Sequence, residues 1–211
     1  MVSPFSTTFA ATENPISESG AWARNQSNAW TNMRTTGGNC VGTQAGSAFD
    51  DSYAIKTGDW GADYKLSATV YRSASLNAGI NHEIELNVRF LDDIDSVRGY
   101  EVLLNHGGAL QCFRWDDSFG LFTLIGLASG TDTVGSVPNG AVYEVQIVGD
   151  IITVFYDSAG LSPAQVCTFN IGSISGAKYT TGNPALAAFC RPTDGANPDH
   201  YGFSAVTITK L

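Results

Sequence analysis

Strict alternation of apolar and polar side chains over residues 82–90 constrains the fold of this 211-residue chain more than any other feature. Successive side chains of a β-strand point to opposite faces of a sheet, so the alternation predicts a strand with one buried and one solvated face. The side chains expected in the core are Ile84, Leu86, Val88 and Phe90. Glu83, Glu85 and Arg89 are then expected on the solvated face.

The same period of two recurs along the chain, whereas helical periodicity is almost absent. Gly149 and Asp150 separate two such segments, which is typical of a two-residue hairpin. The strands expected from the pattern are residues 5–9, 53–57, 66–71, 82–90, 99–105, 110–115, 119–125, 142–148, 151–156, 165–169, 185–190 and 201–209. Many short strands in series predict an all-β, two-sheet antiparallel β-sandwich of the jelly-roll type. We expect residues 1–211 to form a single domain in which the first and last strands pair.

The charge of the chain excludes some partners. There are 11 Lys and Arg residues against 20 Asp and Glu residues, a formal charge of −9. Such a surface repels phosphate groups, so nucleic acid is not an expected partner, and no apolar segment has the roughly 18 residues of a membrane-spanning helix. The N-terminus lacks the basic and apolar regions of a signal peptide. We therefore expect a removed signal, or a route such as virion assembly inside a host cell.

Four cysteines are present, and none is close to another in the sequence: Cys40, Cys112, Cys167 and Cys190. Structural zinc sites usually draw on closely spaced pairs, so a zinc site is not expected. Four cysteines allow three disulfide connectivities, and the sequence does not choose among them. Buried free thiols are the alternative to disulfides.

Several segments together resemble one known group of proteins. They are residues 13–18 (Glu-Asn-Pro-Ile-Ser-Glu) before Trp22, 57–61 (Thr-Gly-Asp-Trp-Gly), 83–86 (Glu-Ile-Glu-Leu), 99–104 (Gly-Tyr-Glu-Val-Leu-Leu), 114–116 (Arg-Trp-Asp), 182–185 (Gly-Asn-Pro-Ala) and 201–203 (Tyr-Gly-Phe). The combination resembles the concanavalin A-like lectin and glucanase superfamily, in its laminin-G-like bacterial and phage branch. The resemblance implies two curved antiparallel sheets stacked face to face. Roles in that superfamily range from sugar binding through glycan cleavage to structural display, so the fold does not decide the function.

Laminarinase-like members of the superfamily place three carboxylates at alternate positions of one strand, and the corresponding residues here are Glu83, Glu85 and Asn87. Retaining glycosidases need two carboxyl groups about 5–5.5 Å apart, one of which donates a proton. Asn87 cannot be that acid, and Glu101 substitutes for it only if the strand register brings Glu101 opposite Glu85. We therefore expect a non-catalytic protein, whose residues for catalysis would otherwise be Glu83, Glu85 and Glu101. Ion pairs across the solvated face are the alternative role for these glutamates.

Acidic turns raise the question of a metal cofactor. Ca²⁺ takes six to eight oxygen ligands, usually from several segments, so one acidic turn is at most part of a site. The candidate calcium ligands are Asp92, Asp93 and Asp95, with the pairs at residues 50–51 and 116–117 as further acidic turns. Solvated turn carboxylates are the alternative, and no cofactor is expected.

Sugar binding requires an aromatic ring for the C–H face of a pyranose, with polar groups beside it. The tryptophans are Trp22, Trp30, Trp60 and Trp115. Trp60 lies in a glycine-rich loop and Trp115 ends a strand, so these two are the candidates for ligand binding, together with Arg89 and Arg114. Burial of each tryptophan in the core is the alternative.

The function predicted from the sequence is a non-catalytic interaction domain on a virion or another extracellular surface. It would be a phage-type decoration or tail component that contacts glycans or other virion proteins, with a homo-oligomer as one possible form. The first alternative is a lectin-like carbohydrate-binding module of a bacterial glycan-utilisation system. The second is a glycoside hydrolase or polysaccharide lyase that uses Glu83 and Glu85.

Overall fold

The computed structural model describes residues 4–25, 29–46, 50–93, 96–118, 121–127 and 133–211. Within these residues the helices are three short 3₁₀ turns: η1 (Ile171–Ser173), η2 (Pro192–Asp194) and η3 (Pro198–His200). None of the described helices is long and apolar enough to span a bilayer. The strands are β1 (Phe5–Thr7), β2 (Thr12–Glu13), β3 (Trp22–Ala23), β4 (Thr31–Thr36), β5 (Cys40–Gly42), β6 (Ser52–Lys56), β7 (Tyr64–Arg72), β8 (His82–Asp93), β9 (Ser96–Asn105), β10 (Leu110–Ser118), β11 (Phe122–Leu127), β12 (Val142–Val148), β13 (Ile151–Asp157), β14 (Ala164–Asn170), β15 (Asn183–Cys190) and β16 (Tyr201–Lys210).

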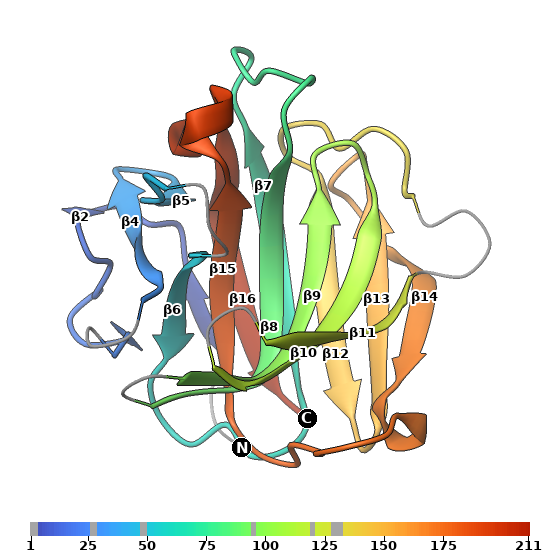
Figure 1. The fold of residues 1–211 in the computed structure, drawn as a ribbon. Helices are drawn as coiled ribbons and strands as arrows, with labels where there is room; N and C mark the ends of the chain where they lie inside the picture. Colours follow the sequence, from blue (N-terminus) through green and yellow to red (C-terminus); the bar gives the residue numbers. More distant parts are fainter. Residues whose placement is uncertain (1–3, 26–28, 47–49, 94–95, 119–120, 128–132) are drawn as a thin grey trace.

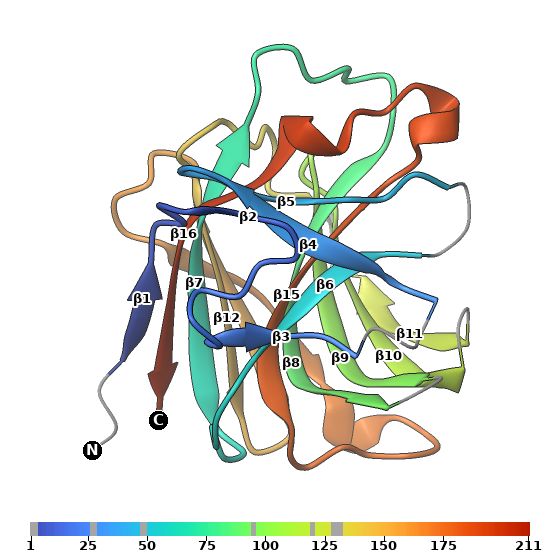
Figure 2. The same cartoon turned by 90° about the vertical axis from the view of Figure 1, so that its left-hand side faces the viewer.

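The strands form two layers, as predicted for a jelly roll. The front sheet has the order β11-β10-β9-β8-β15-β6 and faces the viewer in Figure 1, and the back sheet has the order β5-β16-β7-β12-β13-β14. β4 pairs with β5 of the back sheet and, in parallel, with β6 of the front sheet, so it joins the layers at one edge. Figure 2 shows this edge with β4 crossing it. β1 pairs with β16, so the predicted pairing of the terminal strands is confirmed.

The core lies between the sheets. Ile84, Leu86 and Val88 are fully buried there, as the alternation predicts, and they pack with apolar side chains of both layers. The partners from the neighbouring strands include Val102 and Leu104 of β9 and Leu66 and Val70 of β7. Gly149 has a positive φ of 54° in the two-residue turn between β12 and β13, so the predicted hairpin is also confirmed.

The alternation of β8 breaks at Arg89: Phe90 is buried as predicted, but the faces predicted for residues 89 and 90 are wrong. The pairing of β8 with β9 shifts register between Val88 and Leu91, and Arg89 has a φ of +50°. A bulge of this kind inserts one extra residue, so the side chains beyond it change faces. Phe90 therefore joins a second apolar cluster on the outer face of the front sheet, whereas Arg89 reaches toward the back sheet.

At this bulge the Arg89 guanidinium donates hydrogen bonds to the carbonyl oxygens of Ala62 and Gly149. Gly99 and Gly182 make room for the Arg89 backbone. A Cβ on Gly99 would lie 2.6 Å from the Arg89 carbonyl oxygen, and a Cβ on Gly182 would lie 2.3 Å from its carbonyl carbon. Only glycine fits on both sides of Arg89, because both contacts are with backbone atoms that cannot move aside.

The outer face of the front sheet is covered rather than solvated. A second apolar cluster lies on it: Trp30, Tyr53, Ile55, Phe90, Val97, Trp115, Ala185 and Ala187. The Trp30 ring lies 4.6 Å from that of Trp115 and 5.4 Å from that of Tyr53. Residues before β4 thus shield the sheet, and Glu85 and Asn87 are buried although the alternation predicts them in water.

Candidate functional site

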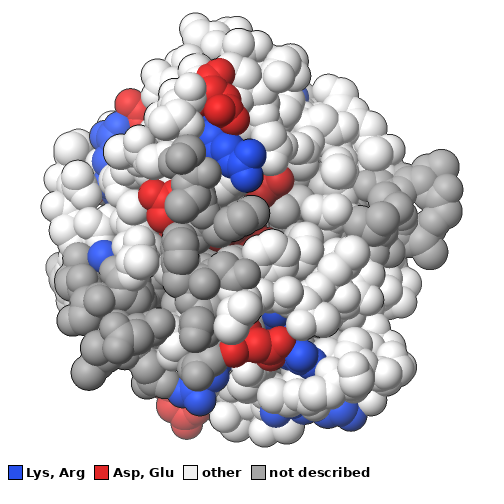
Figure 3. Space-filling model, viewed as in Figure 1, with Lys and Arg blue, Asp and Glu red and all other residues white. Residues whose placement is uncertain are grey.

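A cleft of about 260 Å³ opens on the outer face of the front sheet. This volume is near the lower end of the roughly 300–1,000 Å³ that small-ligand sites occupy. Its lining includes four carboxylic acids: Asp51, Glu83, Glu101 and Asp194. It also includes four aromatic rings: Phe113, Trp115, Phe122 and Phe189. Figure 3 shows acidic side chains deep in the centre of this face, beside a basic one.

Strand register brings polar residues of three elements to the floor of this cleft. Asn87 of β8 pairs with Ala185 of β15 on one side and with Glu101 of β9 on the other. Glu85 precedes Asn87 by two residues in β8, so its side chain is on the same face of the sheet. Side chains directly opposite each other in an antiparallel sheet lie on the same face with Cβ atoms about 4.5–5.5 Å apart. Asp51 precedes β6, and the small alanines of the intervening β15 leave space above the sheet.

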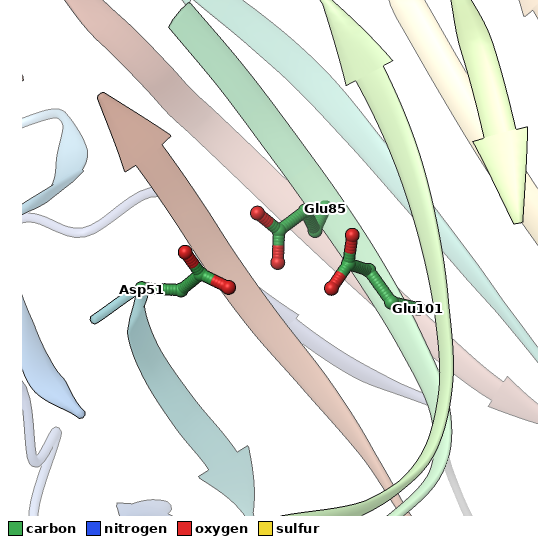
Figure 4. A group of neighbouring side chains, drawn as sticks. All are labelled: Asp51, Glu85 and Glu101. Atoms are coloured by element: carbon green, nitrogen blue, oxygen red, sulfur yellow. The ribbon is translucent and has the colours of Figure 1, made fainter. Parts of the chain in front are cut away.

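Asp51, Glu85 and Glu101 form a buried carboxylate cluster. One oxygen of each lies within 4.8 Å of one oxygen of each of the others, and all three side chains are buried. Figure 4 shows the three carboxyl groups pointing toward one another from the start of β6, from β8 and from β9. Two ionised carboxylates about 4.8 Å apart repel by about 3 kcal/mol at an effective dielectric constant of roughly 20. The cluster cannot hold three negative charges without compensation.

The pKa values of these acids are all raised. Burial raises the pKa of Glu101 to about 8, and the hydrogen bond from the Trp115 indole Nε1 to Glu101 Oε2, 2.5 Å long, opposes that rise. Burial, followed by the charge of Glu101, raises the pKa of Glu85 and of Asp51 well above the usual range. Burial also raises the pKa of Glu83 at the cleft wall to about 7. Near neutral pH the cluster therefore takes up protons or another positive charge.

Two polar side chains in the floor have no partners. Both carboxyl oxygens of Glu85 and both polar atoms of the Asn87 amide lack a hydrogen bond among the described residues. The Asn87 amide adjoins Glu85 and slightly opposes the rise in its pKa, but none of its atoms has hydrogen-bond geometry with a neighbour. A buried polar group without a partner costs about 1–3 kcal/mol. Such groups in a folded protein call for a specific explanation.

Phe122 is the most exposed aromatic ring of the cleft, with 38% of its surface accessible. It meets the Phe113 ring edge-on at 5.3 Å and the Trp115 ring at 5.1 Å, so two other rings hold it in place. Trp115 itself is only 3% exposed. The available sugar platform is therefore a phenylalanine that the sequence analysis placed in a strand without assigning it a role.

The ligand-binding residues predicted from the sequence do not gather in one place. Trp115 lines the cleft, but Trp60 packs in the main core and donates its indole hydrogen bond to the Thr57 carbonyl oxygen. Arg114 holds Asp116 through two hydrogen bonds of 2.5 and 2.7 Å. Arg114 and Arg89 thus support loops and turns, and neither lines the cleft.

The predicted acids are brought together more closely. Glu83 and Glu101 line the cleft, and Glu85 belongs to the cluster beneath it. Glu101 lies opposite Asn87 rather than opposite Glu85. Asp51 completes the cluster, and alternation could not have indicated this because Asp51 lies outside the expected strands.

Asp92, a calcium ligand predicted from the sequence, does not belong to the carboxylate cluster. Asp92 accepts hydrogen bonds from the Tyr53 hydroxyl at 2.9 Å and the Asn25 backbone N–H at 2.5 Å. The side chain of Asp93 and all of Asp95 lie outside the described residues. The four cysteines are buried and form no disulfide among the described residues, so the alternative of buried thiols is the one observed.

Solved structures of other proteins resemble this chain in fold, although its sequence matches none of the known families. No protein-family model and no curated protein matches the sequence. The carbohydrate-binding module CBM66 from Bacillus subtilis has 14% identity and a TM-score of 0.56, over 81% of this chain and 92% of that one. The β-porphyranase BpGH16B from the human gut bacterium Bacteroides plebeius has 8% identity and a TM-score of 0.55, over 98% and 91%. The Ca²⁺-bound exoplasmic/lumenal domain of VIP36 has 11% identity and a TM-score of 0.57, over 91% and 84%.

This chain has the concanavalin A-like jelly-roll fold. The resemblance inferred from the sequence is thereby confirmed for the fold. At identities of 8–14% the similarity does not extend to function.

Proposed function

We propose that the cleft on the outer face of the front sheet binds a neutral glycan without cleaving it. The observation that carries the proposal is the exposed Phe122 ring beside polar groups in a concave site. A pyranose presents a C–H face that packs on an aromatic ring, and its hydroxyl groups need polar partners at the rim. Asn81, Gln111 and Arg191 supply such partners in the lining.

The charge of the lining favours neutral sugars. The cleft has four acids and one arginine, Arg191, in its lining. Carboxyl groups form hydrogen bonds with sugar hydroxyls in either protonation state, and each lining acid that ionises repels sulfate and uronate groups. Anionic glycans are therefore expected to bind more weakly than neutral ones of the same size.

Proteins of similar fold support a role in glycan recognition. CBM66 is described as a carbohydrate-binding module, and structures of VIP36 contain Ca²⁺ with mannose or with Man3GlcNAc. Each description belongs to that protein alone. Together they indicate that this fold accommodates glycans in proteins that resemble the present chain in architecture.

Glycan cleavage is the second candidate function. The cluster oxygens, within 4.8 Å of one another, are close to the roughly 5–5.5 Å between the carboxyl groups of retaining glycosidases. Glu83, with a pKa of about 7, has the value of a general acid. A retaining mechanism also needs an ionised nucleophile, however, and burial disfavours ionisation of all four acids in and beneath the cleft wall. Binding without cleavage therefore fits the electrostatics better.

A glycan array tests the proposal, with neutral and anionic glycans printed together. Binding to neutral glycans is expected, and Phe122→Ala should weaken it by about tenfold, equivalent to about 1.4 kcal/mol. Leu161→Ala is the matched control, because Leu161 is an exposed apolar residue outside the cleft lining. Equal binding by parent and Phe122→Ala, or no binding by a folded parent, would overturn the proposal. New reducing ends after incubation with a bound glycan would replace it by the cleavage function.

Display on a virion or another extracellular surface is a separate proposal, based on the sequence alone. Mass spectrometry of purified particles from the source tests it. Detection of the chain in the particles is expected, and its absence would contradict the proposal.

A further inference from the structure

We propose that Asp51, Glu85 and Glu101, together with the Asn87 amide oxygen, bind one Ca²⁺ ion in the floor of the cleft. The site shares Asp51 and Glu101 with the cleft lining, but its argument does not rest on glycan binding. Two observations point to it: the buried carboxylate cluster, and the unpartnered Asn87 side chain beside it. The acidic turns of the sequence include Asp51, but neither they nor strand alternation indicates Glu85, Glu101 or Asn87 as metal ligands.

The spacing of the cluster matches the size of the ion. Oxygen ligands lie about 2.3–2.6 Å from Ca²⁺, so two oxygens that share one ion are at most roughly 5 Å apart. The three carboxylates satisfy this condition, since their oxygens lie within 4.8 Å of one another. Mg²⁺ binds at about 2.0–2.1 Å and demands near-ideal octahedral geometry, which limits the same separation to roughly 4.2 Å. The all-oxygen donor set also favours a hard cation over Zn²⁺ or Cu²⁺.

Asn87 supplies the second, independent observation. Its side chain is fully buried, both of its polar atoms lack hydrogen bonds to the described residues, and its side of β8 is the one that carries Glu85 and faces Glu101. A proton on Glu85 would relieve part of the repulsion and could be donated to the Asn87 carbonyl oxygen, but one proton serves a single acceptor. A cation can bind the three carboxylates and the Asn87 carbonyl oxygen together, because amide oxygens are normal ligands of Ca²⁺.

The site has a route to solvent. Asp51 and Glu101 belong both to the cluster and to the lining of the cleft, whereas Glu85 lies beneath them. Three carboxylates and one amide supply at most seven oxygens, which is within the six to eight that Ca²⁺ takes. Water that enters from the cleft can complete the shell where a carboxylate binds through one oxygen.

Terbium luminescence tests the site on the full chain after treatment with EDTA. Tb³⁺ shares the oxygen preference of Ca²⁺, and Trp115 donates a hydrogen bond to Glu101, so its indole would lie next to the ion and sensitise its emission. We expect strong sensitised emission, displacement of Tb³⁺ by Ca²⁺, and one bound Ca²⁺ per chain by elemental analysis. Mg²⁺ at the same concentration should displace little, and equal displacement would overturn the assignment to Ca²⁺.

Three variants locate the ion. Glu85→Gln keeps the side-chain volume and should lower the Tb³⁺ affinity at least tenfold, whereas Asn87→Asp adds a charged ligand and should raise it. Asp194→Asn is the matched control, because Asp194 is an acid of the cleft lining outside the cluster. The Tb³⁺ affinity of this variant should equal that of the parent. The proposal is overturned if a folded parent gives no sensitised emission, or if Glu85→Gln and Asp194→Asn bind as the parent does.

Discussion

Replacing Glu85 by glutamine in the cation-free chain is expected to stabilise the fold at pH 8 and to leave it unchanged at pH 4. Glutamine has the size of protonated glutamic acid but carries no charge at either pH. In the unfolded chain Glu85 titrates near its ordinary value of 4.5, whereas burial and Glu101 raise its pKa in the folded chain. Between these values the folded state holds more protons than the unfolded state, so the free energy of unfolding of the parent falls as the pH rises.

The size of the effect follows from the cluster geometry. Each ionised neighbour within 4.8 Å contributes roughly 3 kcal/mol of repulsion at an effective dielectric constant of about 20. We therefore expect Glu85→Gln to be about 2–4 kcal/mol more stable than the parent at pH 8. A gain of about 3 kcal/mol raises the melting temperature of a chain of this length by roughly 6–12 °C. At pH 4, below the ordinary Glu pKa of 4.5, the two proteins should agree within about 0.5 kcal/mol.

Urea unfolding in EDTA at both pH values measures these differences, with Asp194→Asn as the control for loss of an acid at the cleft rim. Added Ca²⁺ should reverse the order at pH 8, because the parent alone keeps all three carboxylate ligands. If Glu85→Gln were less stable than the parent by more than about 1 kcal/mol in EDTA at pH 8, the cost of ionising buried Glu85 next to Glu101 would not control the stability of the cluster.

Three further predictions concern the fold. Leu86→Ala should cost about 2–5 kcal/mol in urea unfolding, because Leu86 is fully buried between the sheets, and a loss below roughly 0.5 kcal/mol would contradict the packing. Gly182→Ala should lower the free energy of unfolding by at least about 3 kcal/mol, because the added Cβ would collide with the Arg89 backbone. Gly20 has a φ of +87° and lies in open space, so Gly20→Ala should cost only the roughly 1–2 kcal/mol of a left-handed residue. Equal costs for the two variants would refute the collision. The four cysteine thiols should stay unreactive toward a thiol reagent in the native chain, because all four are buried. Burial also raises the pKa values of Cys40, Cys112 and Cys190, that of Cys190 to about 12. All four should react in denaturant, and rapid labelling of the native chain would show that they are accessible.

Alternation predicted the strands that span a half-buried sheet. It located β12, β13 and most of β8 and β15, because these strands place apolar side chains at every second position. It missed β2 to β5, which are short or polar and bury residues on both sides of the jelly-roll edge. Propensity and period carry little information where tertiary packing decides the conformation.

The site was less predictable than the fold. Glu83, Glu85 and Glu101 were predicted from one strand and its neighbour, but alternation places Glu85 in water, whereas its side chain is only 1% exposed. The apolar cluster on the same face of the sheet includes Trp30, which comes from a distant segment. The meeting of Asp51 with Glu85 depends on the order of β6, β15 and β8, which alternation does not encode. Gly99 opposite the bulge was the local signal that the alternation would fail at Arg89.

A crystal structure of the chain with a neutral glycan selected on the array tests the central claim most directly. The account predicts a sugar ring in the cleft with its C–H face on Phe122 and its hydroxyl groups toward Asn81, Gln111 and Arg191. A glycan bound to the back sheet or to an edge of the sandwich, with the cleft empty of sugar, would contradict it.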